Sequence, residues 1–499
     1  MKRVIFITLY YFTIIVKGYS QTYFSNRYAF YNKANLTENF ILVNDTFYLA
    51  TGVFDSAMPY TLYKGAVTKI NLNGSIINVP KFNSSKGVYN LPNSLTTVNN
   101  KIYLIGTGGF ANQEQYSLTK LNYNSDTIYN KILGDTSNYN YINRIIPYYK
   151  TKNKILLIGV TDSLCGPGHQ GTYKPIIRVV DTNGVLFQTK LYLSNCKYRN
   201  ITSVDTTENK GYLIGFAGSF TTWQTEARLL KLDSNLNVVW DKQINLVSGG
   251  ACSVVNHKNT QYMVLSTHVD SVWNFNYMWE RVSFTKLDLQ GNVVWQKYYG
   301  VKERPMITSA IKECANGDYI MCGSHVTNQL MGWIMRTDSL GNLKWWKDYR
   351  PDTSPILDTL AQNYLYDIME LPNKDIAAVG WAGQSTISPL QQTWLLKVDS
   401  NGCFGSNNCP QNYITGIPAT NSANVSLTVY PNPTNSILNI DDEKKQFQNA
   451  TIEIKNYLGQ VVFTTAFASQ INLQNLSAGM YFLTIQDKSN SKTVKIIKE

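Results

Sequence analysis

The chain has 499 residues, of which 43% are hydrophobic and only 16% are charged. This length allows a large core and more than one domain. The formal net charge is +12, but the lysines are scattered singly and form no basic run, so nucleic acid is not expected as a partner. The 34 tyrosines, 19 phenylalanines and 10 tryptophans favour β-strands, with Asn and Ser between apolar runs as turns require.

Residues 1–20 are predicted to be a secretory signal peptide. Lys2 and Arg3 provide a positive start, residues 4–16 are apolar but short for a membrane span, and Gly18 and Ser20 are small residues before a cleavage site. No later segment has the pattern of a transmembrane helix. We therefore expect an exported protein without a transmembrane segment.

A turn-forming Asp or Asn recurs after an apolar run at intervals of 50 to 61 residues. The seven anchors are Asn71, Asn122, Asp181, Asp233, Asp288, Asp338 and Asp399. An apolar strand that ends in Gly or Ser precedes each anchor, at Gly52, Gly106, Gly159, Gly215, Ser266, Gly323 and Gly380. Two markers in the same order seven times indicate an internal repeat.

Each repeat is predicted to contain four short antiparallel strands. Asp at the first turn position caps backbone N–H groups, and Gly at the fourth accepts the positive φ that closes the turn. No segment has helical periodicity. The fold class is therefore all-β, with a seven-bladed β-propeller over residues 21–403. A solenoid is the alternative, but a closed ring explains better why the series starts and stops abruptly.

Trp240, Trp295 and Trp345 each follow their anchor by seven residues. We favour packing between neighbouring blades as their role, because aromatic strand residues usually pack. The pattern Asp-x-x-Gly-x-x-x-Trp also resembles the tryptophan-docking motif of pyrroloquinoline quinone (PQQ) propellers. Quinoproteins of that family typically have eight blades and a calcium site, whereas this chain has seven repeats and no convincing ligand cluster, so we expect no cofactor and no metal.

The seventh repeat lacks a fourth strand, because "CFGSNNCP" follows Asp399 and contains too many turn formers. The strand-like segment "TYFSNRYAFYN" precedes the first full repeat and has no partner there. An unpaired edge strand invites aggregation. We therefore predict that residues near Tyr23 to Tyr31 pair antiparallel with Thr393 to Val398 and close the ring.

Seven cysteines are an odd number. Cys403 and Cys409 bracket a short loop and are the first candidate disulfide, and Cys165 and Cys196 are the second. The remaining three are interpreted as buried thiols: Cys252, Cys314 and Cys322. No Cys/His spacing indicates zinc.

Residues 404–426 are rich in Asn, Ser and Pro and are interpreted as a linker. Residues 427–499 then contain alternating strands split by turns, which predict a small β-sandwich. The marks of this module are Tyr430-Pro431-Asn432-Pro433, the turn that contains Gly459, the segment from Leu476 through Gly479 to Tyr481, and a final Lys495-Ile496-Ile497-Lys498.

On these motifs the module resembles the type A C-terminal sorting domain of proteins exported by the type IX (Por) secretion system of Bacteroidota. The resemblance implies the secretion machinery as a partner, passage across the outer membrane, and removal of the module as the cargo is released or attached to the surface. The propeller in front resembles PQQ-like or SBBP-like propellers that are found as cargo.

Candidate catalytic residues are scarce. The four histidines, His169, His257, His268 and His325, have no metal-binding spacing. The carboxylates that could form a pair are Asp162, Asp270, Asp338 and Glu370, and nothing in their spacing selects two of them. No nucleophile elbow or phosphate-binding loop is present.

Two functions therefore remain open: a secreted or surface-attached binding protein for an unidentified glycan or protein, and an exported propeller enzyme acting on glycans or with a quinone. An enzyme is the less favoured. A convergent cluster of carboxylate, His or Arg groups with perturbed pKa values at the central channel would favour it.

Overall fold

The computed structural model describes the chain as two compact units, residues Met1–Tyr413 and Ile414–Glu499, which are considered separately. The residues described are 22–54, 63–82, 91–110, 113–133, 140–162, 173–192, 198–207, 209–219, 225–247, 253–257, 261–273, 277–300, 306–326, 330–351, 362–383, 390–405, 408–410, 428–442, 447, 450–456, 461–487 and 491–499. The expected signal peptide lies outside them. No helix long and apolar enough to cross a membrane is found in this part of the chain.

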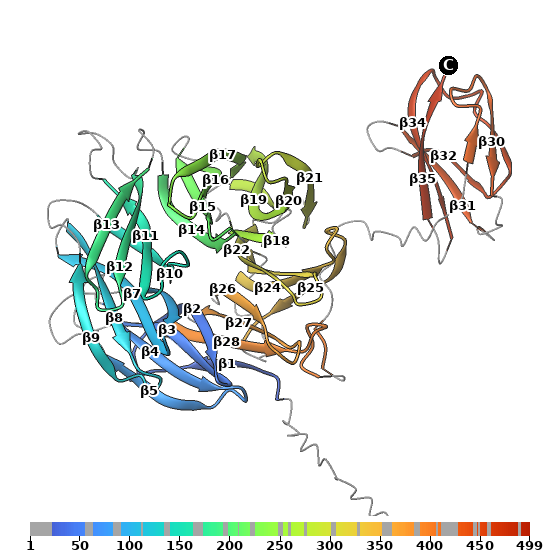
Figure 1. The fold of residues 1–499 in the computed structure, drawn as a ribbon. Coiled ribbons are helices and arrows are strands. Elements are labelled where there is room, and N and C mark those ends of the chain that lie inside the picture. The colour runs from blue at the N-terminus through green and yellow to red at the C-terminus, as the bar shows by residue number, and fades with distance from the viewer. Residues whose placement is uncertain are drawn as a thin grey trace, which may run out of the picture. The chain divides into compact units, whose positions relative to one another are not determined.

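The first unit is a seven-bladed β-propeller whose blades are four-stranded antiparallel sheets (Figure 1). Blade 1 contains β2 (Asn35–Val43), β3 (Thr46–Phe54), β4 (Tyr63–Asn71) and β5 (Ile76–Phe82). Blade 2 contains β6 (Leu91–Val98), β7 (Lys101–Phe110), β8 (Gln113–Leu121) and β9 (Thr127–Leu133). Blade 3 contains β10 (Asn140–Pro147), β11 (Lys154–Thr161), β12 (Lys174–Asp181) and β13 (Leu186–Leu191). Blade 4 contains β14 (Tyr198–Thr206), β15 (Tyr212–Ser219), β16 (Thr225–Leu232) and β17 (Val238–Val247).

Blade 5 contains β18 (Ser253–His257), β19 (Gln261–Trp273), β20 (Tyr277–Leu287) and β21 (Val293–Tyr299). Blade 6 contains β22 (Met306–Glu313), β23 (Tyr319–Val326), β24 (Leu330–Thr337) and β25 (Leu343–Tyr349). Blade 7 contains β26 (Asn363–Glu370), β27 (Ile376–Ala382), β28 (Gln392–Val398) and β1 (Phe24–Tyr28). The first strand of each blade contacts the first strand of the next, and β2 contacts β26, so these inner strands line a closed central channel.

The N-terminal strand closes the ring, as the sequence predicted. β1 pairs antiparallel with β28, from Phe24 opposite Lys397 to Tyr28 opposite Thr393. In Figure 1 the blue strand β1 lies beside the orange strand β28. The pairing covers the edge that blade 7 would otherwise expose, because the chain after Asp399 turns away instead of forming a fourth strand.

The seven anchor turns share one hydrogen-bonding pattern. In the turn at Asp288, the N–H of Gly291 donates to the backbone carbonyl of Asp288 at 3.0 Å and the N–H of Asn292 donates to its Oδ1 at 2.7 Å. The fourth residue has positive φ in every copy: Gly74, Ser125, Gly184, Leu236, Gly291, Gly341 and Gly402. Asp or Asn is required because its short side chain reaches the N–H groups that the turn leaves open.

The Lys-x-Asp lysine joins neighbouring blades. Lys120 Nζ donates to the carbonyl of Thr182, the residue after the next anchor, at 2.9 Å. The same contact is made by Lys69 to Tyr123, Lys231 to Leu289, Arg336 to Ser400 and Lys397 to Leu72. The last of these links blade 7 to blade 1. The repeated motif therefore forms a hydrogen bond between each of these blades and the next.

Aromatic residues of the outer strands add further contacts to the anchor turn of the next blade. The indole N–H of Trp240 donates to Leu289 O at 3.0 Å and that of Trp345 to Ser400 O at 3.3 Å. A Cβ at Gly341 would lie 2.7 Å from the Trp295 ring, which explains why glycine is needed there. The tryptophans pack between neighbouring blades, which confirms the interpretation favoured from the sequence.

The glycine-ended marker reflects a close approach of two backbones. A Cβ at Gly323 would lie 1.9 Å from Ile307 O on the inner strand, and one at Gly380 would lie 1.7 Å from Tyr364 O. In blades 1 and 4 the glycine of the marker lies one residue away from this close approach. The cross-strand register, fixed by the pairing with the Lys-x-Asp lysine, places Thr51 and Phe216 at this position instead of Gly52 and Gly215.

The second unit is a small β-sandwich. One sheet contains β29 (Thr428–Tyr430), β30 (Ile437–Asp441) and β33 (Gln470–Asn472). The other contains β31 (Thr451–Asn456), β32 (Val461–Ala466), β34 (Gly479–Gln486) and β35 (Ser491–Lys498). Alternate residues of both sheets, among them Leu438, Ile452 and Leu483, form its core.

Candidate functional site

The inner strands carry a repeated β-bulge halfway along the channel. Six of the seven described inner strands have the register shift that marks it. The residues at the bulge are Glu38, Asn93, Asn143, Thr202, Ser309 and Tyr366. Bulges re-aim side chains and are frequent next to functional sites.

In several blades the residue after the bulge bonds to a neighbouring blade. Asn39 donates from Nδ2 to Asp367 Oδ2 at 2.7 Å and accepts the N–H of Leu95 at 2.9 Å, so blades 7, 1 and 2 are linked in series. Arg144 donates from Nη2 to Thr202 O at 2.6 Å, which links blades 3 and 4. The main role of these polar side chains along the channel is therefore to bond neighbouring blades to each other.

Four charged groups from four blades interact electrostatically in this channel: Glu38, Arg144, Lys312 and Asp367. Burial raises the pKa of the Glu38 carboxyl, and the charge of Arg144 opposes the shift. Burial also raises the pKa of Asp367, against the charges of Lys312 and Arg144 and the N–H of Ile368. Because blades 7 and 3 are not neighbours, the interaction of Asp367 with Arg144 acts across the channel.

The two carboxyls differ in their bonding. Asp367 accepts hydrogen bonds from Asn39 and from the N–H of Ile368 at 3.0 Å, and it is only 8% exposed. Glu38 is half-buried and precedes Asn39 on the bulge. Glu38 is therefore the residue of the pair that keeps more exposed surface, while its carboxyl group is itself buried.

An aromatic cluster lies on β26 and β27 at the same level. The rings of Tyr364 and Tyr366 stack with centroids 6.1 Å apart, and the rings of Tyr364 and Trp381 are 4.6 Å apart. The indole N–H of Trp381 donates to the Tyr366 hydroxyl at 3.1 Å. All three side chains are half-buried. Tyr366 and Glu38 are the bulge residues that precede the bonded pair Asp367 and Asn39, which places them at one level of neighbouring blades.

Glu38, Tyr364, Tyr366 and Trp381 are called the channel site below. It extends from the bulges toward the end of the propeller opposite the anchor turns, because Tyr364 is near the start of β26 and Trp381 near the end of β27. The site combines flat aromatic surface with a carboxyl whose pKa is raised. Such a combination suits a ligand that has both apolar C–H faces and hydroxyl groups.

The carboxylates considered from the sequence are not brought together. Asp162 follows β11, Asp270 lies in β19, and Asp338 caps its anchor turn. Glu370 accepts the N–H of Ala315 at 2.8 Å. Among the residues that the structure describes, no group of three or more His, Cys, Asp or Glu side chains could hold a metal.

The histidines lie in separate contacts. His257 Nδ1 is 2.8 Å from Glu313 Oε1, and the fully buried His325 is 2.9 Å from Asp348. The ring of His268 lies against Tyr298 with centroids 4.5 Å apart. His169 is outside the described residues.

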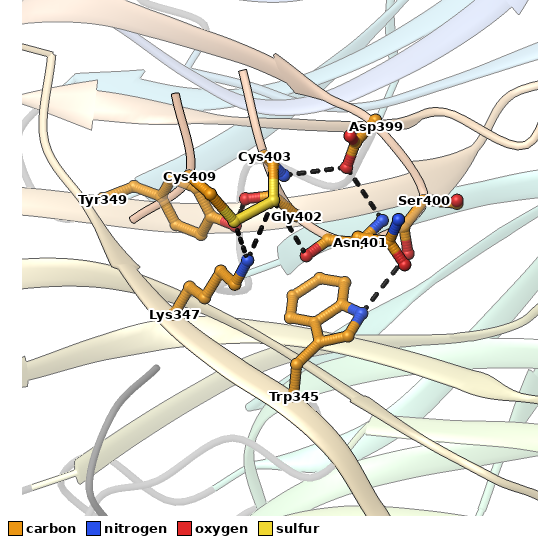
Figure 2. Close-up of a disulfide and its surroundings, with 9 residues drawn as sticks. All are labelled: Trp345, Lys347, Tyr349, Asp399, Ser400, Asn401, Gly402, Cys403 and Cys409. Carbon is orange, nitrogen blue, oxygen red and sulfur yellow. Dashed lines mark hydrogen bonds between the residues drawn. A yellow bond between two sulfur atoms is a disulfide. The ribbon is translucent and has the colours of Figure 1, made fainter. Parts of the chain in front are cut away.

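The structure contains a disulfide between Cys403 and Cys409, just after the last anchor turn (Figure 2). Cys314 and Cys322 are buried thiols. Burial raises the pKa of Cys314 to about 12. The candidate pair Cys165 and Cys196, and also Cys252, lie outside the described residues.

The motif residues of the C-terminal unit meet at its last strand. Asn432 donates from Nδ2 to Lys495 O at 2.8 Å and accepts the N–H of Ile497 at 2.9 Å. Thr434, next to Pro433, forms a parallel bridge with Lys498. This segment therefore ties the first strand region to the C-terminal end.

The other motif positions have different roles. Tyr430 ends β29 and is half exposed, and Pro431 follows it. Gly479 begins β34, and Tyr481 donates its hydroxyl to Ser477 O at 2.8 Å. Gly459 lies outside the described residues.

The channel site was missed in the sequence. Its members come from strands more than 300 residues apart, and the bulge that aims them has no composition signal. The aromatic pattern Tyr-x-Tyr at 364–366 was the available hint, but it also fits a packed strand.

Comparison with known proteins identifies one region. Residues 428–499 match the family described as the secretion system C-terminal sorting domain. No curated protein sequence matches the chain.

Several solved structures resemble the propeller at low identity. A protein of unknown function from Dyadobacter fermentans is 10% identical with a TM-score of 0.44, and the match covers 76% of this chain and 98% of that one. A periplasmic gluconolactonase from Pseudomonas aeruginosa is 8% identical with a TM-score of 0.42, over 77% of this chain and 99% of that one. An α-L-arabinofuranosidase from Fusarium graminearum is 12% identical with a TM-score of 0.39, over 61% and 88%.

Proposed function

We propose that this chain, a propeller protein with a type IX secretion sorting domain, is an extracellular module that binds a glycan at the channel site. Residues 1–20 would direct it across the inner membrane as a signal peptide, and the sorting domain would direct it across the outer membrane of a Bacteroidota cell. The mature protein would then be released or held at the cell surface.

The observation that carries this proposal is the aromatic cluster of blade 7, which lies at the level of Glu38 on the neighbouring blade 1. A sugar ring packs its C–H face on an aromatic ring, and its hydroxyls pair with carboxyl and phenol groups. Tyr364, Tyr366 and Trp381 supply the flat surface, and the Tyr366 hydroxyl and Glu38 supply polar partners. The rigid ring holds these groups in place, which limits the ordering cost of binding.

A glycan array with the secreted protein, followed by titration of the strongest ligand, tests the proposal. We expect Trp381→Ala and Glu38→Gln to weaken binding by about tenfold or more, which corresponds to about 1.4 kcal/mol. Phe187→Ala is the matched control, because Phe187 is 56% exposed on the outer strand of blade 3. Binding by Trp381→Ala that equals wild type would refute the site.

A second function, glycan cleavage, is favoured by one observation. Burial raises the pKa of both Glu38 and Asp367, and a raised pKa is what a general acid needs near neutral pH. In this case the bound glycan would be converted to shorter products, and Glu38→Gln would abolish conversion even at glycan concentrations that saturate its weakened binding. Recovery of the intact glycan after prolonged incubation would refute cleavage and leave binding as the only proposed function.

A further inference from the structure

Three blade interfaces share a contact between a lysine and an asparagine. The lysine lies two residues after the outer-strand aromatic position, and the asparagine ends the anchor turn of the next blade. Nζ to Oδ1 distances are 3.0 Å for Lys190–Asn237, 2.7 Å for Lys242–Asn292 and 3.0 Å for Lys297–Asn342. At the interface of blades 6 and 7 the equivalent residues are Lys347 and Cys403.

Lys347 therefore faces sulfur instead of an amide oxygen. Its Nζ is 3.1 Å from Cys403 Sγ and 2.5 Å from Cys409 Sγ (Figure 2). Lys347 is only 4% exposed. Burial lowers the pKa of its ammonium, and Asp399 opposes the shift.

The two sulfurs differ in accessibility. Cys403 is 8% exposed, and its N–H donates to Asp399 Oδ1 at 2.8 Å, so the anchor turn holds it. Cys409 is an exposed residue. A reagent in solution therefore reaches Cys409 more easily than Cys403.

We propose that Cys403–Cys409 is a thiol–disulfide exchange site for external small-molecule thiols, with Lys347 as the group that stabilises the leaving thiolate. The external thiolate attacks Cys409 Sγ and forms a new S–S bond to it. The Cys403–Cys409 bond breaks, and its electron pair leaves on Cys403 Sγ beside the ammonium of Lys347. A second external thiolate then attacks the external sulfur of this mixed disulfide, yields the oxidised small molecule, and leaves Cys409 as a thiolate.

The physical reason lies in the leaving group. Thiol exchange is faster when the departing thiolate is more stable, and an adjacent lysine stabilises a thiolate. The oxidised pair is neutral and gives the ammonium no opposite charge, whereas the Cys403 thiolate does. Exchange thus relieves the buried charge of Lys347, and after the first step only Cys403 remains fixed by its turn.

Incubation of the full chain with glutathione, followed by alkylation and peptide mass mapping, tests this site. We expect a mixed disulfide on Cys409, an alkylated Cys403, and unreacted Cys314 and Cys322. A mixed disulfide on Cys403 would overturn the proposal without need of any variant.

The role of the lysine is tested by rate. We expect Lys347→Met to slow glutathione exchange about tenfold, and Lys347→Arg, which keeps the charge, to stay closer to wild type. Lys297→Met is the matched control, because Lys297 makes the equivalent contact with Asn342. Equal rates for folded Lys347→Met and wild type would refute the role of Lys347. If Lys347→Met does not fold, Lys347→Arg decides: an exchange rate within threefold of wild type supports the role of the charge, and a loss of tenfold or more refutes it.

Discussion

Replacing Phe24 by alanine tests whether the N-terminal strand is a structural part of the propeller. The Phe24 ring is 8% exposed and lies over the anchor turn of blade 1, where a Cβ at Gly74 would be 3.0 Å from it. It occupies the place that Trp295 and Trp345 take in blades 5 and 6. Tyr28, four residues later, donates its hydroxyl to Gly74 O at 2.8 Å, as Tyr349 does to Gly402 O.

The expected cost follows from this burial. Truncating a buried Phe to Ala removes apolar contact and leaves a cavity, which costs about 3–5 kcal/mol. A domain has a total stability of about 5–15 kcal/mol, so this loss is a large part of it. Phe187→Ala makes the same change at a 56% exposed ring, over which Lys154 Nζ lies at 3.9 Å, and should cost below about 1 kcal/mol.

Equilibrium unfolding followed by tryptophan fluorescence measures this difference. All 10 tryptophans precede residue 414, so the signal reports the propeller and not the C-terminal unit. We expect the Phe24→Ala midpoint to fall far below those of wild type and Phe187→Ala. Equal midpoints for the two variants would mean that β1 does not hold the ring.

Two further predictions concern single side chains. Ser125→Gly should stabilise the propeller by about 1 kcal/mol in the same assay, because Ser125 has φ +65° and a buried hydroxyl without a partner among the described residues. Leu236→Gly, at the same turn position of blade 4, should instead destabilise the propeller because it removes a buried side chain. Burial raises the pKa of Glu280 to about 8, so the folded state holds a proton that the unfolded state loses between pH 4.5 and 8, and stability falls as pH rises through that range. Glu280→Gln should remove this fall, which is on the order of 5 kcal/mol, and parallel pH profiles of the two proteins would contradict the assignment.

The ring and its closure could be predicted because the chain repeats them. Each anchor turn needs a short acceptor side chain and, in most copies, glycine, so the pattern survives in the sequence. The pairing of the strand near Phe24 is predictable because blade 7 has no fourth strand of its own. The sequence also contains a signal for the tyrosine contacts to the next anchor turn. Tyr28 follows Phe24 by four residues, as Tyr349 follows Trp345.

The channel site could not be predicted in this way. Glu38 and Tyr366 lie on neighbouring strands only because the closed ring places β2 next to β26, and the direction of their side chains depends on bulges. The one-residue error at Gly52 and Gly215 has a related cause. The glycine pattern alone shifts these two strands by one residue, because the strands of a blade are aligned by cross-strand pairing with the lysine.

The central expectation is that the propeller acts outside the cell after the sorting domain has directed its export. Its most direct test is to locate the propeller in cultures of the native bacterium that express either the full chain or a form without residues 428–499, and to measure the intact mass of what is exported. We expect the full chain outside the outer membrane without its last ~70 residues, because proteolysis is tolerated best near chain termini, and the truncated form in the periplasm. Equal export of the truncated form would contradict the role of the sorting domain, and an exported protein that keeps residue 499 would contradict its removal.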